Sequence, residues 1–344
     1  MSSFRALWVI QRYRPTFTGM GVLADHLARH LKPLGVEVEI ATNTLPGEPR
    51  LDDSQYPIVK RFPMPISRNP FVMKRESREL KEYLEDCRDR FKIVHVLGGP
   101  TTFPMVLKQA QKNGQKTLIT STLLNSDDPV TLSQGKLGFI RRNAYKSADH
   151  FVTLSEALIN TYEQAGIDRS KVSLIPPGAD LDRDASQRTR EEAAASLGWK
   201  LNVPRVIFVG VVLHRKGVDV LMNAWTKVKE AVPEAQLYMV GPNDIPEAPD
   251  KVAIVQTALD AMKQSPHANS VHFLGRETDA DRLAMMFRAA HTFAFPTRME
   301  GSPVVIIESL AAGTPPVVAR IPGITDRTVR DGETGFVVEQ DDPE

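Results

Sequence analysis

The chain has 344 residues, a length at which one hydrophobic core has usually stopped growing, so two domains are expected. Its composition is typical of a globular protein, with 42% hydrophobic and 25% charged residues. A single cysteine, Cys87, excludes an internal disulfide, and no apolar run reaches the roughly 18 residues of a membrane span.

The net charge of +1 is unevenly distributed, because residues 1–180 hold 25 basic and 19 acidic side chains and the remainder holds 18 and 23. A basic first half favours an anionic partner, and peripheral contact with lipid headgroups is a less favoured alternative.

Short apolar runs alternate with longer amphipathic segments, which is the β-α-β pattern of a parallel sheet covered on both faces. The strands expected in the first half are Ala6–Ile10, Glu37–Ala41, Ile93–Leu97, Thr117–Ser121, His150–Leu154 and Val172–Ile175. Helical patterns over Gly21–Leu34 and Met105–Asn113 lie between them. The segment 74–84 mixes both signs of charge, so we expect it to be a solvated helix rather than a membrane-binding one.

The first strand leads into a polar segment that holds Gly19 and Gly21 just before a helix. Glycine lets the backbone approach a ligand closely. The third glycine of the dinucleotide-binding fingerprint and a suitably placed acidic residue on the next strand are missing. A nicotinamide or flavin enzyme is therefore not expected.

A segment without a strong period separates this series from a second one. It contains two prolines and a glycine near its start, which mark a hinge or linker. The second series of strands is Val206–Gly210, Gln236–Val240, Val271–Leu274, Thr292–Phe295, Pro316–Ala319 and Gly335–Val338, with helices at Val218–Glu230, Asp281–Ala290 and Pro303–Ala312. We therefore expect two Rossmann-like, doubly wound α/β domains, residues 1–175 and 204–344, joined by the linker 176–203 and facing each other across a ligand-binding cleft.

The strand Val206–Gly210 runs into a turn that holds adjacent Arg215 and Lys216 and then into a helix. Two cations and the N–H groups of a helix start would suit a phosphate, although the spacing of a P-loop is missing. Taken alone, such a pair is more often surface charge. Its position at the carboxyl end of a strand favours a binding site.

Residues 296–315 place Glu300 and Glu308 around a Gly-Ser-Pro turn that opens an apolar helix. Ser302 is expected as the N-cap and Pro303 as the first helical residue, so the following N–H groups would face an anion such as a diphosphate. Glu308, between one and two turns inside the helix, would be a buried carboxylate able to accept two ribose hydroxyls, and Glu300 would be free on the loop to meet a sugar hydroxyl. The alternative is that both carboxylates are solvated and only complement the helix dipole.

Other chemistries lack their signatures. The spacing of histidine and cysteine offers no zinc site, no Asp-x-Asp metal motif follows a strand of the second domain, and no Gly-x-Ser-x-Gly elbow of a serine hydrolase is present.

Together these segments resemble glycosyltransferase family 4, the retaining GT-B nucleotide-sugar transferases, over nearly the whole chain. The resemblance is strongest in segments 271–276 and 288–297, in the Glu300/Glu308 block, and in segments 313–318 and 323–336. It implies transfer of a sugar from a UDP-, GDP- or ADP-sugar to an acceptor hydroxyl, by a same-face displacement without a metal or other cofactor. It further implies a cytoplasmic enzyme of carbohydrate biosynthesis that does not bind nucleic acid, whose acceptor is a glycan, a lipid-linked sugar or a small molecule.

The resemblance also assigns roles to residues. Glu300, Arg215 and Lys216 would be catalytic, Glu300 through the donor sugar and the two cations through the diphosphate, and Glu308 would bind the ribose. The amide groups that complete this site would come from Gly301, Ser302, Pro303, Val304 and Val305. Gly210 would belong to the same donor site, Gly275 and Arg276 would lie near the nucleobase, and Gly19 would approach the diphosphate from the first domain.

The chain departs from the family pattern in three places. Val211 replaces an arginine that usually follows the glycine of the first strand in the second domain, and Arg215 would supply that charge. A histidine expected near Leu97 is missing, because His95 should be buried inside its strand, and a second is replaced near Thr122. The C-terminal helices of the family are also expected to be missing. The alternative function is thus a catalytically silent nucleotide-sugar-binding or scaffold protein, and an epimerase or a pyridoxal-phosphate phosphorylase is a weaker third.

Overall fold

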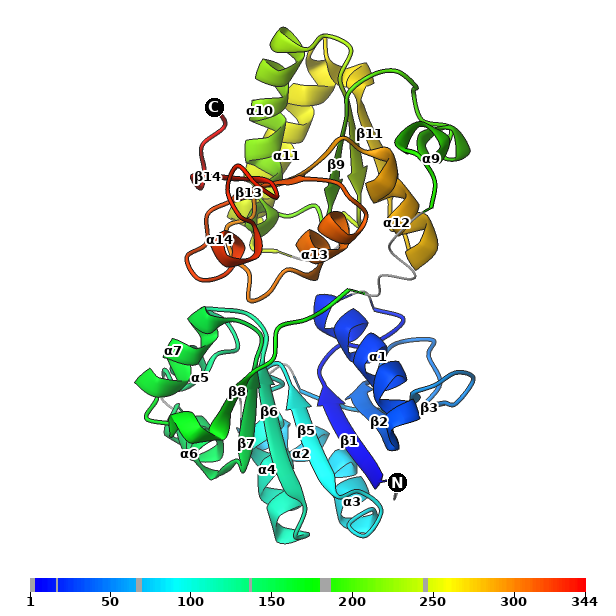
Figure 1. Ribbon diagram of the computed structural model, residues 1–344. Coiled ribbons are helices and arrows are strands. Elements are labelled where there is room, and N and C mark those ends of the chain that lie inside the picture. The colour runs from blue at the N-terminus through cyan, green and yellow to red at the C-terminus, as the bar shows by residue number, and fades with distance from the viewer. Residues whose placement is uncertain (1–3, 17, 66–69, 136–137, 180–186, 244–246) are drawn as a thin grey trace. The chain divides into compact units, whose positions relative to one another are not determined.

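The computed structural model describes residues 4–16, 18–65, 70–135, 138–179, 187–243 and 247–344 (Figure 1). The chain divides into two compact units, Met1–Pro177 and Gly178–Glu344. Within the segment 176–203 that was expected to be a linker, residues 180–186 lie outside the described part of the chain. The rest of that segment includes a helix, α9 (Arg190–Ser196), that belongs to the second unit and packs on α12 (Ala280–Ala289).

The first unit is built on an eight-stranded sheet with the order β3-β4-β2-β1-β5-β6-β7-β8. Its strands are β1 (Phe4–Ile10), β2 (Val36–Asn43), β3 (Leu51–Asp52), β4 (Ile58–Phe62), β5 (Ile93–Leu97), β6 (Lys116–Ser121), β7 (His150–Thr153) and β8 (Val172–Leu174). Its helices are α1 (Gly19–Leu31), α2 (Pro70–Glu76), α3 (Arg78–Asp86), α4 (Phe103–Lys112), α5 (Pro129–Leu132), α6 (Gly138–Ser147) and α7 (Glu156–Gln164). All strand pairs of this sheet are parallel except β3 with β4.

The central strand β1 shows why this sheet has two buried faces. Leu7 and Val9 belong to one core cluster, which includes side chains of α3 and α4. Ala6, Trp8 and Ile10 belong to a second cluster, which includes side chains of α1. Because successive side chains of a strand point to opposite faces, the uninterrupted apolar run of β1 supplies both cores. Each large side chain buried in this way contributes about 1.5–3 kcal/mol.

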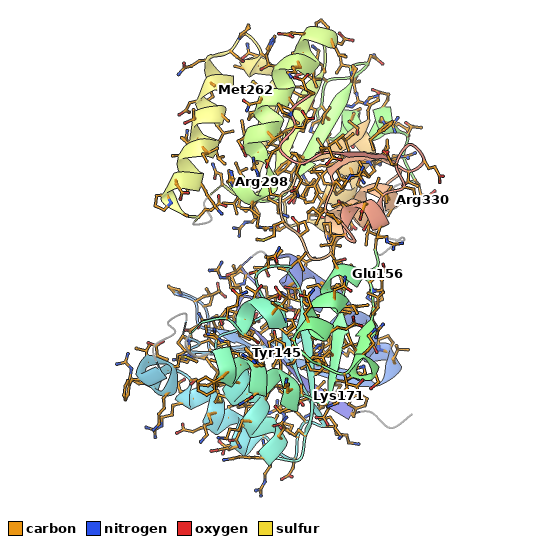
Figure 2. All side chains as sticks on the ribbon, turned by 90° about the vertical axis from the view of Figure 1, so that its left-hand side faces the viewer. Tyr145, Glu156, Lys171, Met262, Arg298 and Arg330 are labelled. Carbon is orange, nitrogen blue, oxygen red and sulfur yellow. The ribbon has the colours of Figure 1, made fainter. Side chains whose placement is uncertain are left out.

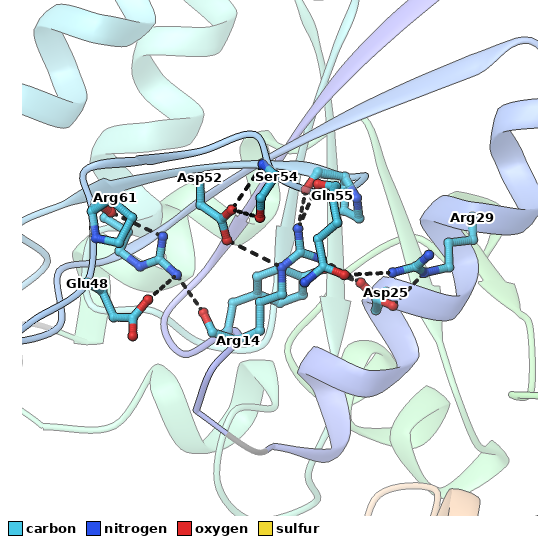
Figure 3. A network of polar contacts seen from close by, with 11 residues as sticks. Arg14, Asp25, Arg29, Glu48, Asp52, Ser54, Gln55 and Arg61 are labelled. Atoms are coloured by element: carbon cyan, nitrogen blue, oxygen red, sulfur yellow. Dashed lines mark hydrogen bonds and ion pairs between the residues drawn. The ribbon is translucent and has the colours of Figure 1, made fainter. Parts of the chain in front are cut away.

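The β3–β4 hairpin was not expected, and it corrects the prediction of a wholly parallel sheet in this unit. A polar network fastens it to the end of β1 (Figure 3). Arg61, which is 2% exposed, donates to the carbonyl oxygens of Arg14 at 2.8 Å and of Pro49 at 3.3 Å. Arg14 bonds Asp25 of α1 at 2.8 Å and lies 3.8 Å from Asp52 of β3. The network therefore fixes the residues that precede the glycine segment at the start of α1.

The second unit has a six-stranded, wholly parallel sheet with the order β11-β10-β9-β12-β13-β14. Its strands are β9 (Arg205–Val209), β10 (Gln236–Val240), β11 (Val271–Gly275), β12 (Thr292–Phe295), β13 (Pro316–Ala319) and β14 (Phe336–Val338). Besides α9 and α12, its helices are α10 (Val218–Ala231), α11 (Pro249–Gln264), α13 (Val304–Ala311) and α14 (Thr325–Thr328). Short 3-10 turns complete the two units: η1 (Lys32–Leu34), η2 (Arg169–Lys171), η3 (His214–Lys216) and η4 (Ala268–Ser270). In the described part of the chain, no helix is both long enough and apolar enough to cross a bilayer.

His95 lies inside β5 and is half-buried, whereas a buried side chain was expected from the sequence. Its ring meets Trp8 edge-on at 5.6 Å between centroids, and Nε2 is 2.7 Å from the hydroxyl of Thr120. Burial lowers the pKa of His95 to about 4, because the charged imidazole is poorly solvated there. The fold therefore holds this side chain in its neutral form.

The pH dependence of stability tests this assignment. The pKa of His95 falls from about 6.5 in the unfolded chain to about 4 in the fold, so its protonation favours unfolding as the pH drops from 6.5 to 4. In urea titrations, His95→Gln is expected to lose stability less steeply than the parent over this window, by at most about 1.4 kcal/mol per pH unit. His30→Gln, at an exposed position on α1, is the control and should follow the parent profile. Parallel profiles for the parent and His95→Gln would contradict the assignment.

Candidate functional site

The carboxyl ends of β9 and β12 lie side by side at the centre of the second sheet, where the strand order reverses. Ligands of open parallel sheets bind at such a reversal, because the loops that follow the two strands run in opposite directions and leave room between them. The segments that follow are 210–217, which leads into α10, and 296–303, which leads into α13. They carry most of the residues selected from the sequence.

These two segments touch through backbone atoms at Gly217. Its φ is +70°, and a β-carbon built there would lie 1.8 Å from the carbonyl oxygen of Pro296. Only glycine accepts both the left-handed conformation and this approach. Close by, the N–H of Arg298 donates to the carbonyl oxygen of Arg215 at 2.9 Å. The importance of Gly217 was not predicted, although a glycine directly before a helix could have indicated it.

Arg298, labelled in Figure 2, joins the segments a second time through its side chain. Its guanidinium binds both carboxylate oxygens of Asp219 at 2.7 Å, donates to the carbonyl oxygen of His214, and bonds Asp341 through Nε at 2.6 Å. Asp219 is buried in the first turn of α10. Burial opposes its ionisation, but the hydrogen bonds and charge of Arg298 outweigh burial and keep the pKa of Asp219 below its ordinary value. This pair was missed, since nothing in the sequence links positions 79 residues apart.

The turn after β9 is also held from the other side, by Glu247. Its carboxylate accepts the backbone N–H groups of His214 at 2.9 Å and of Arg215 at 3.3 Å. A carboxylate at the N-terminus of a helical turn satisfies donors that would otherwise lack a partner. The backbone of the turn that carries Arg215 and Lys216 is therefore held by Glu247 as well as by Arg298.

Both cations meet Glu300, and this corrects the expectation that Glu300 is free on its loop. Glu300 is 8% exposed, and its Oε1 accepts from Lys216 Nζ at 2.5 Å, from Arg215 at 3.2 Å and from the hydroxyl of Thr297 at 2.8 Å. Lys216 Nζ also lies 4.7 Å from the centre of the Phe295 ring. Two neighbouring cations with restricted solvation need a counter-charge, and Glu300 supplies it.

The neighbours of Lys216 change the pKa of its amine. Burial lowers its pKa most strongly, the charge of Glu300 opposes that effect, and the adjacent Arg215 lowers the pKa further. The net pKa is below the ordinary value of a lysine. A negatively charged ligand near Lys216 would further favour the charged form of its amine.

The start of α13 differs from the prediction by one residue. Pro303, with ψ of 101°, is the N-cap, and Ser302 makes no capping bond. Pro303 also has no N–H group, so it cannot contribute an amide to an anion site. Among the described residues, none accepts a hydrogen bond from the amides of Val304 and Val305. These two groups therefore remain donors for an anion at the helix start.

The remaining residues selected from the sequence are more widely distributed. Glu308 is the fifth residue of α13 and is half-buried rather than buried. Gly210 directly follows β9, and its N–H donates to the carbonyl oxygen of Val240 at 2.9 Å. Gly275 is the last residue of β11 and Arg276 follows it; both are exposed and lie two strands from β9 along the same edge. Gly19 is the exposed first residue of α1, in the other unit. The structure thus brings Arg215, Lys216 and Glu300 together beside α13.

Comparison with known proteins gives consistent matches. A family model described as Glycosyltransferase Family 4 matches residues 17–183, and one described as Glycosyl transferases group 1 matches residues 203–344. D-inositol 3-phosphate glycosyltransferase of Nocardia farcinica is 28% identical over 345 aligned residues, covering 93% of this chain and 73% of that protein. The protein of the same name from Streptomyces scabiei is 33% identical over 202 residues, covering 54% of this chain and 43% of its own length. The crystal structure of Anabaena HepE with UDP and glucose has the same fold, with a TM-score of 0.76 at 15% identity over 99% of this chain and 87% of that one.

Replacing Gly217 tests the contact between the two segments. Gly217→Ala should cost at least about 3 kcal/mol of unfolding free energy, because the left-handed backbone is strained and the segments must also separate. Gly198→Ala is a matched control, since Gly198 has φ of +68° but open space around the added methyl group, and it should cost about 1–2 kcal/mol. Urea denaturation of both variants measures the difference. Equal costs would show that the contact with Pro296 is unimportant.

Proposed function

This chain belongs to the group 1 glycosyltransferases of family 4, transferases of the GT-B fold, and from that premise we propose that it moves a sugar from a nucleoside-diphosphate sugar to an acceptor hydroxyl with retention of configuration. The observation that carries the proposal is the convergence of Arg215 and Lys216 on Glu300, near the amides of Val304 and Val305, which have no acceptor among the described residues. A diphosphate is bound by cations and backbone amides, and the sugar attached to it is bound by a carboxylate that accepts its hydroxyl groups.

In the proposed complex, Arg215 and Lys216 bind the diphosphate and the amides of Val304 and Val305 complete its contacts. Glu300 accepts a hydroxyl of the donor sugar. Glu308 accepts the ribose hydroxyls from its place one turn further into α13. Gly275 and Arg276 lie toward the nucleobase, and Gly210 lines the same site. The donor is a UDP-, GDP- or ADP-sugar, and UDP is the first to test because HepE was crystallised with it.

The proposed reaction is a same-face displacement. The acceptor oxygen bonds to the anomeric carbon on the face from which the carbon–oxygen bond to the diphosphate breaks, and the acceptor proton passes to the departing phosphate oxygen. Arg215, Lys216 and the start of α13 stabilise the charge that develops on the leaving group. Because these groups can supply that stabilisation, we propose that the reaction does not require a metal ion.

Two observations indicate what kind of acceptor the enzyme would use. The first half of the chain is the basic half, and the two relatives named above are D-inositol 3-phosphate glycosyltransferases. A hydroxyl compound that carries a phosphate group fits both observations. D-inositol 3-phosphate is therefore the first acceptor to assay.

A second candidate function is a nucleotide-sugar-binding protein without transferase activity. The observation in its favour is His95, which bonds Thr120 inside the sheet, while the carboxyl end of β5 holds Leu97 and no histidine. Slow hydrolysis of the bound donor, followed over hours, distinguishes the two. Release of free sugar supports the transferase, and a donor that stays intact while bound supports the silent protein.

Calorimetry with UDP, GDP and ADP tests the donor site. At least one of them should bind the parent chain, and Lys216→Ala should weaken it by about 10-fold or more, because a charge-assisted hydrogen bond contributes about 1.5–3 kcal/mol. Lys251→Ala removes an exposed cation of α11 and is the matched control. A parent chain that binds none of the three, or equal losses in both variants, would contradict the assignment.

Chelation tests the proposed independence from metal ions. Donor hydrolysis in excess EDTA should stay within about twofold of the untreated rate, because Arg215 and Lys216 supply the positive charge that stabilises the leaving group. A large loss that added Mg²⁺ restores would show that a metal ion shares this role.

A further inference from the structure

Thr297 is fully buried in the segment 296–303, where it faces the segment 210–217. Its hydroxyl lies 2.8 Å from Glu300 Oε1 and 3.3 Å from the carbonyl oxygen of Arg215. A hydroxyl has one proton, and a carboxylate is a stronger acceptor than a backbone carbonyl. The shorter contact is therefore the main hydrogen bond, with Thr297 as donor and Glu300 as acceptor.

The donors around Glu300 are unevenly placed on its two oxygens. Thr297, Arg215 and Lys216 all donate to Oε1. Among the residues that the structure describes, none donates to Oε2. This arrangement fixes the rotation of the carboxylate group and leaves Oε2 as the oxygen that can accept a hydrogen bond from a ligand.

Two of the three donors have another task in the proposed function. Arg215 and Lys216 are the cations assigned to the diphosphate, and phosphate oxygens compete with Glu300 for their N–H groups. Thr297 is neutral and buried, so a phosphate does not attract it in the same way. When the cations turn to the diphosphate, the hydroxyl of Thr297 is the donor that stays on Oε1.

We propose that Thr297 is a positioning residue for sugar transfer, which keeps Oε2 of Glu300 directed at the donor sugar while Arg215 and Lys216 bind the diphosphate. The inference rests on the proposed function and adds that nucleotide binding and sugar transfer depend on different residues. Binding of the nucleotide depends on the cations, whereas the rate of transfer depends on the orientation of the carboxylate, and therefore on Thr297.

Three variants separate this role from a general structural one. Thr297→Val removes the hydroxyl and keeps the shape, Thr297→Ser keeps the hydroxyl, and Thr292→Val removes a hydroxyl that bonds the carbonyl oxygen of Pro315 at the other end of β12. Affinity for UDP, GDP and ADP is measured by calorimetry. Steady-state rates of donor hydrolysis are measured with UDP-glucose, GDP-mannose and ADP-glucose.

Thr297→Val should bind the nucleoside diphosphate within about threefold of the parent but lose about 10- to 100-fold in kcat, with little change in KM. Thr297→Ser should recover to within about threefold, and Thr292→Val should match the parent throughout. If Thr297→Val kept the kcat of the parent, or lost affinity and kcat equally, the inference would be overturned. Nucleotide binding by the parent chain would still support the proposed function in that case. Failure of the parent chain to bind any of the three nucleotides would overturn both.

Discussion

The site depends on one backbone contact, the approach of the segment after β9 to the segment after β12 at Gly217 and Pro296. A side chain at position 217 would push these segments apart, and the groups that meet in the site come from positions about 80 residues apart in the chain. Once the backbones are joined, the bond from Arg298 to the carbonyl oxygen of Arg215 sets their register. The strand order reverses between β9 and β12, where ligands of such sheets bind. Gly217 lets the two segments at this reversal come into backbone contact.

Two ion pairs in this region have different consequences because their hydrogen bonds are distributed differently. Asp219 uses both oxygens on Arg298, whose remaining groups bind His214 and Asp341, so the pair has little left to offer a ligand. Removing one partner of such a buried pair costs about 3–5 kcal/mol, which is typical of a structural pair. Glu300 instead receives three donors on one oxygen, and two of those donors are cations that a phosphate can attract. The first pair holds the segments together, and the second can exchange partners when an anion arrives.

Strands and helices were predicted well where one physical signal dominated. The strands Ile93–Leu97, Gln236–Val240, Thr292–Phe295 and Pro316–Ala319 are confirmed with their predicted bounds, because buried parallel strands form short, uninterrupted apolar runs. Helix α11 was missed, since exposed Val252 and Ile254 obscure its amphipathic period. The β3–β4 hairpin was missed because Lys60 and Arg61 interrupt the apolar run of β4. The motif around Glu300 was found from the sequence. Its pairing with both cations was not, because burial and long-range contacts decide the partner of a carboxylate.

The central claim is that Arg215, Lys216 and Glu300 bind the diphosphate and the sugar of one donor molecule. A crystal structure of the chain with an intact nucleoside-diphosphate sugar tests it most directly. The account predicts phosphate oxygens within hydrogen-bond distance of Arg215, Lys216 and the amides of Val304 and Val305, with a sugar hydroxyl on Oε2 of Glu300. A donor bound elsewhere, with Glu300 still paired to both cations, would contradict the account.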